Sequence, residues 1–412
     1  MKKIYEEVAG AHISGFVEPE FQAVADSFIH NFSLRNELGA SCCVRVGEQT
    51  VVDLWGGFSS VEKTQRWQED TVAVVFSCTK AMTALCAHLL IERGQLKLKE
   101  PVATYWPEFA QHGKDKITVE MMLNHSSALP AFRQPIKPDG YDDWDYMVKR
   151  LEQEEPFWLP GTRTGYHLIS FGWTVGELIR RVSGMSLGQF FDQELAQPLQ
   201  ADFWIGLPED KANRVAPVAM GPIDQSQPMS DFMTAIINDP TSISHLALLN
   251  SGGNNANSVA TLRAEIGGAG GVSNARAMAK LFSPLANGGV VGDRQYFSQQ
   301  SIQRMSTVST ATMLDATLLV PTRFALGFMK SMDNRACKAG NTDSFIIGDR
   351  AFGHVGAGGS TVFADPDNKL AFAYTMNLMG PGVLLNHRGQ SLVDAAYLSL
   401  GYQNNTSGYW SI

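Results

Sequence analysis

The sequence has little charge, few cysteines and no long apolar stretch, and each absence argues against a class of protein. Among its 412 residues, 33 lysines and arginines stand against 41 aspartates and glutamates, so the formal net charge is −8. Phosphate contacts need a basic surface, so this balance argues against a protein that binds nucleic acid or an anionic membrane. No window approaches the roughly 18 uncharged apolar residues of a membrane-spanning helix, and residues 1–7 run into acids where a secretory signal would turn apolar.

Cysteine and histidine spacings argue against disulfides and metals. The nine histidines show neither His-x-x-x-His nor His-Glu-x-x-His spacing, so we expect no metal site, and we expect no cofactor. The five cysteines are odd in number, form no Cys-x-x-Cys pair and lie mostly inside apolar runs, which predicts buried, reduced thiols in a cytoplasmic protein. They are Cys42, Cys43, Cys78, Cys86 and Cys337.

Patterns typical of one sheet layer occur at both ends of the chain. Apolar residues at helical spacing predict a helix over 18–34, and two β-rich runs around a turn predict a hairpin over 40–60. Far downstream, a second hairpin is predicted over 360–374, followed by an amphipathic helix over 388–400. We therefore expect an α+β fold in which the two ends share a sheet layer.

The middle of the chain reads as a helical insertion. Helices are predicted over 80–93, 170–182 and 187–195, and the Gly/Asn-rich segment 250–258 is typical of an exposed loop. A chain of this length exceeds the size at which a single hydrophobic core stops growing, so two or three domains, or one large core with an insertion, are expected.

The first candidate for chemistry is a serine and lysine pair. An extended apolar run, residues 72–76, reaches Ser77, where a helical pattern begins, so the serine lies where backbone N–H groups and the helix dipole favour a negatively charged oxygen. Lys80 follows three residues later on the same helix face. An ammonium in apolar surroundings loses its proton more readily and can serve as a base. The pair is a Ser-x-x-Lys nucleophile candidate; the alternative is an N-cap serine beside a solvated lysine.

Two further segments carry groups that could work with this pair. Tyr166 ends a Pro/Gly loop before a helix and could pass protons, although a half-buried tyrosine with its hydroxyl in water is the alternative. The glycine-rich segment 352–360 precedes the second hairpin. Glycines there allow a ligand to approach the backbone, and its N–H groups could stabilise an oxyanion, although alone the segment would be a turn.

In order and separation, these three pieces resemble the serine β-lactamase and penicillin-binding-protein superfamily over nearly the whole chain. More closely, the sequence looks like the class C-like, or family VIII, carboxylesterases. The resemblance implies a β-lactamase/transpeptidase-like fold: an antiparallel sheet flanked by helices, formed by residues 1–76 and 266–412, and a mainly helical domain, 77–265, with the active site at their interface. It extends to segments 122–129, 160–167, 180–184, 268–273 and 364–366.

The resemblance also implies roles for particular residues. Ser77 would be the acylated nucleophile, Lys80 its base or proton relay, and Tyr166 a general base and acid. The backbone N–H groups of Ser77 and Ala357 would form the oxyanion hole. The residues expected to contact substrate are His354, Gly356, Asn124, His125 and His167, although the last three could equally brace loops.

Two departures from the family pattern bear on the substrate. Leu168 stands where the family's Tyr-x-Asn motif has asparagine, and His354-Val355-Gly356 replaces the Lys-Thr-Gly box of true β-lactamases. A histidine is mostly neutral at pH 7, so it recognises a carboxylate less well than lysine does. This favours neutral esters over cell-wall substrates.

One motif competes for the nucleophile. Residues 184–188 match Gly-x-Ser-x-Gly, and Asp365 and His387 could complete a triad with Ser186. A nucleophile elbow needs a strand before its serine, whereas a helical pattern precedes this one, so we expect Ser186 to be a helix N-cap with Gln189 at the N3 position.

The sequence thus predicts a metal-free, cofactor-free serine carboxylesterase that hydrolyses small carboxylic esters through a Ser77 acyl-enzyme. Alternatives at the same site are a β-lactamase, a D-amino-acid peptidase or an acyltransferase, and the contrasting alternative is a catalytically silent scaffold. The expected partner is a small-molecule ester, with no nucleic acid and no membrane, and the oligomeric state stays open.

Overall fold

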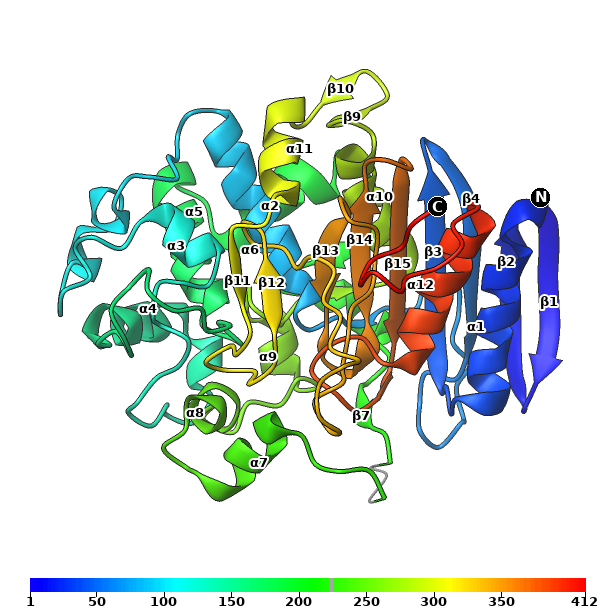
Figure 1. Cartoon of the computed structure of the whole chain (residues 1–412), viewed down its shortest axis with the longest axis horizontal. Helices are drawn as coiled ribbons and strands as arrows, with labels where there is room; N and C mark the ends of the chain where they lie inside the picture. Colours follow the sequence, from blue (N-terminus) through cyan, green and yellow to red (C-terminus); the bar gives the residue numbers. More distant parts are fainter. Residues whose placement is uncertain (223–225) are drawn as a thin grey trace.

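The computed structural model describes residues 1–222 and 226–412; the three others fall within the part expected to be helical. In the described residues, the largest sheet has seven antiparallel strands in the order β1-β2-β4-β3-β15-β14-β13 (Figure 1). Its strands are β1 (Lys2–Val8), β2 (Ala11–Val17), β3 (Gly39–Val46), β4 (Gln49–Gly57), β13 (Phe352–Val355), β14 (Thr361–Asp365) and β15 (Leu370–Met376).

The two ends of the chain meet in the middle of this sheet. Strand β3 pairs with β15, with Cys43 opposite Ala373. Both predicted hairpins are present, as β3–β4 and β14–β15, and the predicted α+β fold is confirmed. The hairpin β1–β2 was not predicted, because β1 is an edge strand with one fully buried side chain, Ile4, among charged neighbours.

Alternate residues of the strands face two separate cores. Cys42 belongs to a core that includes side chains of α1 (Gln22–Leu34) and α12 (His387–Ser399), two helices packed against each other. Cys43 belongs to the other core, with α10 (Ala275–Ala286), which packs on β3, β14 and β15. This alternation is the period of two expected for strands buried on both faces.

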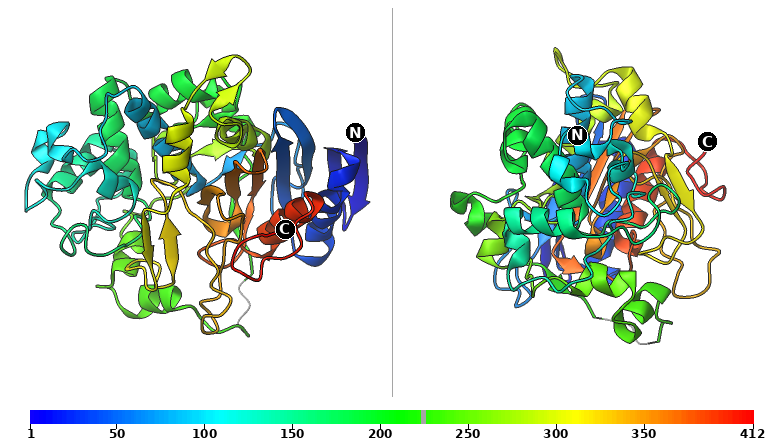
Figure 2. Two further views of the ribbon diagram at one scale, coloured as in Figure 1. Left: turned by 45° about the horizontal axis from the view of Figure 1, so that its top comes forward. Right: turned by 90° about the vertical axis from the view of Figure 1, so that its left-hand side faces the viewer.

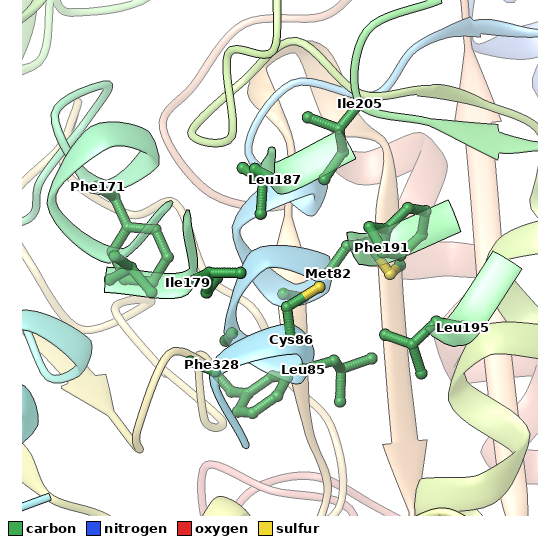
Figure 3. Packing of buried hydrophobic residues seen from close by; sticks show 14 of the residues in the cluster. Met82, Leu85, Cys86, Phe171, Ile179, Leu187, Phe191, Leu195, Ile205 and Phe328 are labelled. Carbon is green, nitrogen blue, oxygen red and sulfur yellow. The ribbon is translucent and has the colours of Figure 1, made fainter. Parts of the chain in front are cut away.

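The helical part lies beside the β13 edge of the sheet, opposite the β1 edge (Figures 1 and 2). Its central helix, α2 (Cys78–Glu92), is buried along nearly its whole length against α5 (Phe171–Ser183) and α6 (Leu187–Phe191), with Met82, Leu85 and Cys86 among the packed side chains (Figure 3). The helix predicted over 187–195 changes character after Phe191 and continues as a π-helical turn, Asp192–Ala196.

The remaining helices and strands are short and complete the layers. The helices are α3 (Val119–Leu123), α4 (Trp144–Gln153), α7 (Asp231–Asn238), α8 (Ile243–Leu249), α9 (Val259–Arg263) and α11 (Gln299–Ser306). The strands are β5 (Ala73–Val74), β6 (Phe203–Trp204), β7 (Ala219–Met220), β8 (Val272–Ser273), β9 (Val290–Val291), β10 (Arg294–Gln295), β11 (Thr310–Thr312), β12 (Thr322–Phe324) and β16 (Leu378–Met379).

Two expectations about the chain's environment can be compared with the structure. The cysteine thiols are free; Cys337 is half-buried, and the other four are buried, as predicted. Across residues 1–222 and 226–412, no helix is both long and apolar enough to cross a membrane.

Candidate active site

Ser77 lies at the N-cap of α2, three residues after the end of the short strand β5. Its neighbour Phe76 has φ of +44°, a left-handed conformation that costs an L-residue about 1–2 kcal/mol. The Ser77 hydroxyl makes no capping hydrogen bond to the helix backbone. The serine oxygen is therefore left free for another partner, and strained backbone of this kind is found preferentially at functional sites.

That partner is Lys80, one turn along α2 and fully buried. Its Nζ lies 3.0 Å from Ser77 Oγ and 2.7 Å from each of two backbone carbonyl oxygens, those of Leu168 and Gly268. Leu168 occupies the position at which the family has asparagine, and here its backbone supplies the lysine's acceptor. The predicted pairing of Ser77 with Lys80 on one helix face is present.

Burial favours the neutral form of this lysine. Desolvation lowers the pKa of Lys80 well below its usual value, with Cys78 opposing the effect only weakly. A neutral amine has two N–H donors and one lone pair. In that neutral form the two carbonyl groups can take both donors, which leaves the lone pair to accept the proton of Ser77, whose Oγ lies 3.0 Å from Nζ.

Tyr166, from the loop before α5, lies next to Lys80. Its backbone N–H donates to both carboxylate oxygens of buried Asp315, at 3.0 and 3.1 Å, and its ring stacks on Phe324 at 5.7 Å between centroids. Burial raises the pKa of the Tyr166 phenol far above its usual range; Ser77 lies close enough to oppose this rise, but the contact is not a hydrogen bond of normal geometry. Lys80 Nζ is 4.8 Å from the centre of the Tyr166 ring.

Asp315 was missed by the sequence analysis. Besides Tyr166, it accepts hydrogen bonds from the backbone of Thr317 and Leu318 and from the Thr322 hydroxyl. An aspartate followed by threonine two residues later is typical of a local turn, in which the side chain accepts from the backbone. Nothing in that pattern indicates the contact with Tyr166, 149 residues away.

The two expected oxyanion donors come from different parts of the chain. Ser77 begins α2, and Ala357 follows β13 in a glycine turn. A Cβ at Gly356 would lie 2.2 Å from the Val75 carbonyl oxygen, so only glycine lets β13 come this close to the start of α2. Within the part of the chain that the structure describes, neither the Ser77 nor the Ala357 amide donates a hydrogen bond, and the Ala357 residue is exposed.

His354 is buried beneath this turn. Its Nδ1 lies 2.7 Å from the Val355 carbonyl oxygen, which can only accept, so Nδ1 carries the proton and Nε2 presents a lone pair. Burial lowers the pKa of His354 to about 3, so the imidazole is neutral at pH 7. Among the described residues, neither His354 Nε2 nor the nearby Tyr166 hydroxyl has a hydrogen-bond partner; their ring centroids are 6.0 Å apart. A catalytic role is one of the recognised reasons for a buried polar atom to lack a partner within the protein.

The other residues expected at the substrate hold two loops together. His125 accepts from the backbone N–H of His167, and the His167 ring lies between His125 Nδ1, at 3.2 Å, and Ser127 Oγ, at 2.7 Å. Both histidines are buried, and Asn124 bonds to Ser126 and Ser309. In this structure they brace the loop beneath Tyr166, and contact with substrate stays a prediction.

The competing motif does not form a nucleophile elbow. Ser186 is the N-cap of α6 in a capping box with Gln189, as predicted, and its hydroxyl donates to Glu265 at 2.7 Å. Asp365 binds Tyr397 and Asn368 instead of a catalytic histidine.

No group of three or more His, Cys, Asp or Glu side chains among residues 1–222 and 226–412 is arranged to hold a metal ion. The seven-stranded sheet and the adjoining helices are typical of the β-lactamase/transpeptidase-like fold, and the Ser77–Lys80 pair is the arrangement expected of a serine hydrolase with that fold.

Comparison with known proteins identifies the family. The Beta-lactamase family model matches residues 26–397, so the chain belongs to the beta-lactamase family. The protein Esterase/beta-lactamase LipL of Mycobacterium tuberculosis (strain ATCC 25618 / H37Rv) is 32% identical over 395 residues, which are 92% of this chain and 87% of that protein.

Two solved structures are similar over almost the entire chain. One is a family VIII carboxylesterase, 34% identical, with a TM-score of 0.82 and coverage of 94% of this chain and 99% of that one. The other is a penicillin-binding protein homologue from Caulobacter crescentus, 32% identical, with a TM-score of 0.81 and the same coverage. The resemblance stated from the sequence is therefore confirmed.

Proposed function

We propose that the protein is a serine carboxylesterase that hydrolyses small carboxylic esters through an acyl-enzyme on Ser77. The observation that carries the proposal is the 3.0 Å approach of Ser77 Oγ to the buried amine of Lys80, whose other two contacts are carbonyl oxygens. A lysine held in this way can accept a proton but has no carboxylate to keep it charged. The names of LipL and of the family VIII carboxylesterase support an esterase.

The directions of the pKa shifts in the site support separate roles for Lys80 and Tyr166 in proton transfer. Because burial lowers the pKa of Lys80 and raises that of Tyr166, it favours a neutral amine and a protonated phenol in the resting site. Lys80 is then the base that takes the Ser77 proton as Oγ attacks the ester carbonyl. The tetrahedral oxyanion accepts hydrogen bonds from the Ser77 and Ala357 amides, and the alcohol leaves with a proton passed through Tyr166, which recovers its own from Lys80. Water then cleaves the acyl-enzyme by the reverse proton path.

The tautomer of His354 favours uncharged substrates. A carboxylate placed against this side chain would face the lone pair of Nε2, because the only imidazole proton is donated to Val355. A lysine at the same position would offer a cation instead. The site therefore suits a neutral ester better than a β-lactam or a stem peptide, whose carboxylate needs a donor.

The alternatives use the same serine. LipL bears both activities in its name, so β-lactam hydrolysis is the second candidate function. A D-amino-acid peptidase or an acyltransferase would differ in the acyl donor or acceptor. A silent scaffold would retain no reactive serine, which a fluorophosphonate probe detects directly.

The proposal extends to the molecule as a whole. We place the site at the interface of a sheet domain, residues 1–76 and 266–412, and a mainly helical domain, 77–265, because Ser77 and Ala357 come one from each part. Free cysteines support a cytoplasmic location. The acidic net charge supports a small-molecule ester as the partner, with neither nucleic acid nor membrane.

The test is a comparison of initial rates on p-nitrophenyl butyrate and nitrocefin for the wild type, Ser77→Ala and the control Ser186→Ala. We expect rapid ester cleavage that only Ser77→Ala abolishes, with little nitrocefin turnover. Loss of activity in Ser186→Ala with retention in Ser77→Ala would refute the assignment. Preferential nitrocefin hydrolysis would favour the β-lactamase.

A further inference from the structure

The turn that carries Ala357, residues 356–359, has no polar side chain of its own. The Gly359 N–H donates to the Gly356 carbonyl at 3.0 Å, and Gly358 has φ of +86° and ψ of −12°, the values at the third position of a type II turn. Gly359 also has a positive φ, of +120°. The direction of the Ala357 amide therefore depends on hydrogen bonds to the turn's backbone.

Because peptide bonds are planar, a hydrogen bond at one peptide of the turn also orients the groups on the other side of that peptide. The Gly356 carbonyl and the Ala357 N–H share one planar unit and point in opposite directions, so a donor that fixes the carbonyl also fixes the N–H. That donor is the Gly359 N–H. The Gly359 N–H belongs to the same planar peptide unit as the Gly358 carbonyl, so a donor that holds the Gly358 oxygen also orients the Ala357 amide through the hydrogen bond from Gly359 to Gly356.

The Gly358 oxygen is held by a side chain from the start of α12. Asn386 donates from Nδ2 to this oxygen at 2.7 Å, and the Gly380 N–H donates to it at 2.9 Å. The other end of the same amide is fixed as well, because Asn386 Oδ1 is the N-cap that accepts from the Arg388 and Gly389 amides at 3.1 and 3.3 Å. Packing is tight enough that a Cβ on Gly359 would lie 2.3 Å from Nδ2.

We propose that Asn386 is a positioning residue that aligns the Ala357 amide for the oxyanion, acting through Gly358 and Gly359. The inference rests on the proposed function, in which that amide stabilises the tetrahedral intermediate. It couples α12, which packs on α1 at the face of the sheet, to the chemistry at the start of α2.

The substitution Asn386→Ser distinguishes the two roles of the Asn386 side chain, the N-cap acceptor Oδ1 and the donor Nδ2. Serine caps a helix about as well as asparagine, so α12 keeps its N-cap oxygen while Gly358 loses the Nδ2 donor. We expect kcat on p-nitrophenyl butyrate to fall by about 10–100-fold with KM within about twofold, since misplacing one oxyanion donor acts on the transition state. Affinity for phenylboronic acid, whose tetrahedral adduct uses the oxyanion hole, should fall by the same factor.

A second variant and a control keep the test decisive. Asn386→Asp keeps the shape and the cap but turns a carboxylate oxygen toward Gly358, so kcat should fall at least as far. Ser298→Ala removes the N-cap of α11, away from the turn, and should lower the thermal midpoint without changing kcat. Rates are expressed per reactive serine, titrated with a fluorophosphonate, so a partly unfolded sample is not mistaken for a slow enzyme.

The outcomes separate this inference from the proposed function. Wild-type kcat and boronic acid affinity in Asn386→Ser, with Ser77→Ala inactive, would overturn the role of Asn386 alone. Activity that survives in Ser77→Ala would overturn the proposed function itself. A kcat loss that the boronic acid affinity does not follow would also count against positioning of the oxyanion donor.

Discussion

Replacing Lys80 with arginine and, separately, with methionine distinguishes a base from a fixed positive charge. Arginine keeps the charge but cannot give up its proton, whereas methionine has similar length and neither charge nor lone pair. If Lys80 works as a neutral amine that accepts the Ser77 proton, both variants should lose esterase activity to the same extent. If its charge alone promotes catalysis, arginine should retain much of the activity.

The size of the effect follows from the role. A positioned general base contributes about 10²–10⁴-fold to the rate, or about 3–5 kcal/mol of activation free energy. Both variants should therefore lower kcat/KM on p-nitrophenyl butyrate by at least about a hundredfold. In the wild type, kcat/KM should rise with pH as Lys80 loses its proton and level off well below pH 10.5, since burial lowers the pKa of Lys80. In both variants this rise of kcat/KM with pH should be absent.

Lys114 provides a matched control. It is also fully buried, its Nζ donates to the backbone carbonyls of Glu152 and Glu154, and it lies 5.3 Å from the centre of the Phe109 ring. Lys114→Met should cost stability, about 1–3 kcal/mol for each carbonyl left unpaired, and leave kcat unchanged. Retention of more than about a tenth of wild-type kcat in a folded Lys80→Arg variant would refute the neutral-base reasoning, since a base contributes at least about a hundredfold.

Three further predictions concern the surroundings of the site. Asp315→Asn removes one of the two oxygens that accept hydrogen bonds from the backbone, so it should lower the free energy of unfolding by about 1–3 kcal/mol. It should also lower kcat with little change in KM, and denaturant unfolding and initial rates measure the two effects. An unchanged kcat would show that Asp315 does not position Tyr166 for catalysis. Tyr166→Phe should lower kcat and Tyr166→Leu should lower it further, since phenylalanine keeps the ring beside the lysine; equal rates would exclude a role for the ring. Glu37→Gln leaves buried Arg388 without its counter-ion and should lower the free energy of unfolding, measured by urea denaturation, by about 3–5 kcal/mol. A loss below about 1 kcal/mol, the value typical of exposed ion pairs, would contradict a buried Glu37–Arg388 pair.

Local patterns predicted those parts of the fold whose contacts are local. The strand alternation of β3–β4 and β14–β15 and the apolar spacing of α1 and α2 are set by neighbouring residues, and they were recognised. Strand β1 was missed because an edge strand exposes most of its side chains and so lacks the alternation. The π-helical turn after Phe191 was missed because helical spacing does not distinguish an α-helix from a π-helix.

The same limit applies to the site. Ser77 and Lys80 are one turn apart on a helix, so their meeting follows from the sequence alone. The contacts of Tyr166 with Asp315 and of Asn386 with Gly358 join segments 149 and 28 residues apart, and no periodicity encodes them. The lowered pKa of Lys80 likewise depends on burial by the complete fold.

The proposed proton transfer gives a role to the groups that surround the Lys80 amine. In the proposed mechanism, an ammonium forms when Lys80 takes the Ser77 proton. The face of the Tyr166 ring, 4.8 Å from Nζ, and the carbonyl oxygens of Leu168 and Gly268, each 2.7 Å away, interact more strongly with this cation than with the amine. They are oriented before the reaction, so they stabilise the transition state more than the ground state. Burial still penalises an isolated ammonium, so the cation is favoured only as the oxyanion forms beside it. A substrate carboxylate would favour the ammonium at rest and remove the base, which is a second reason for this site to prefer neutral esters.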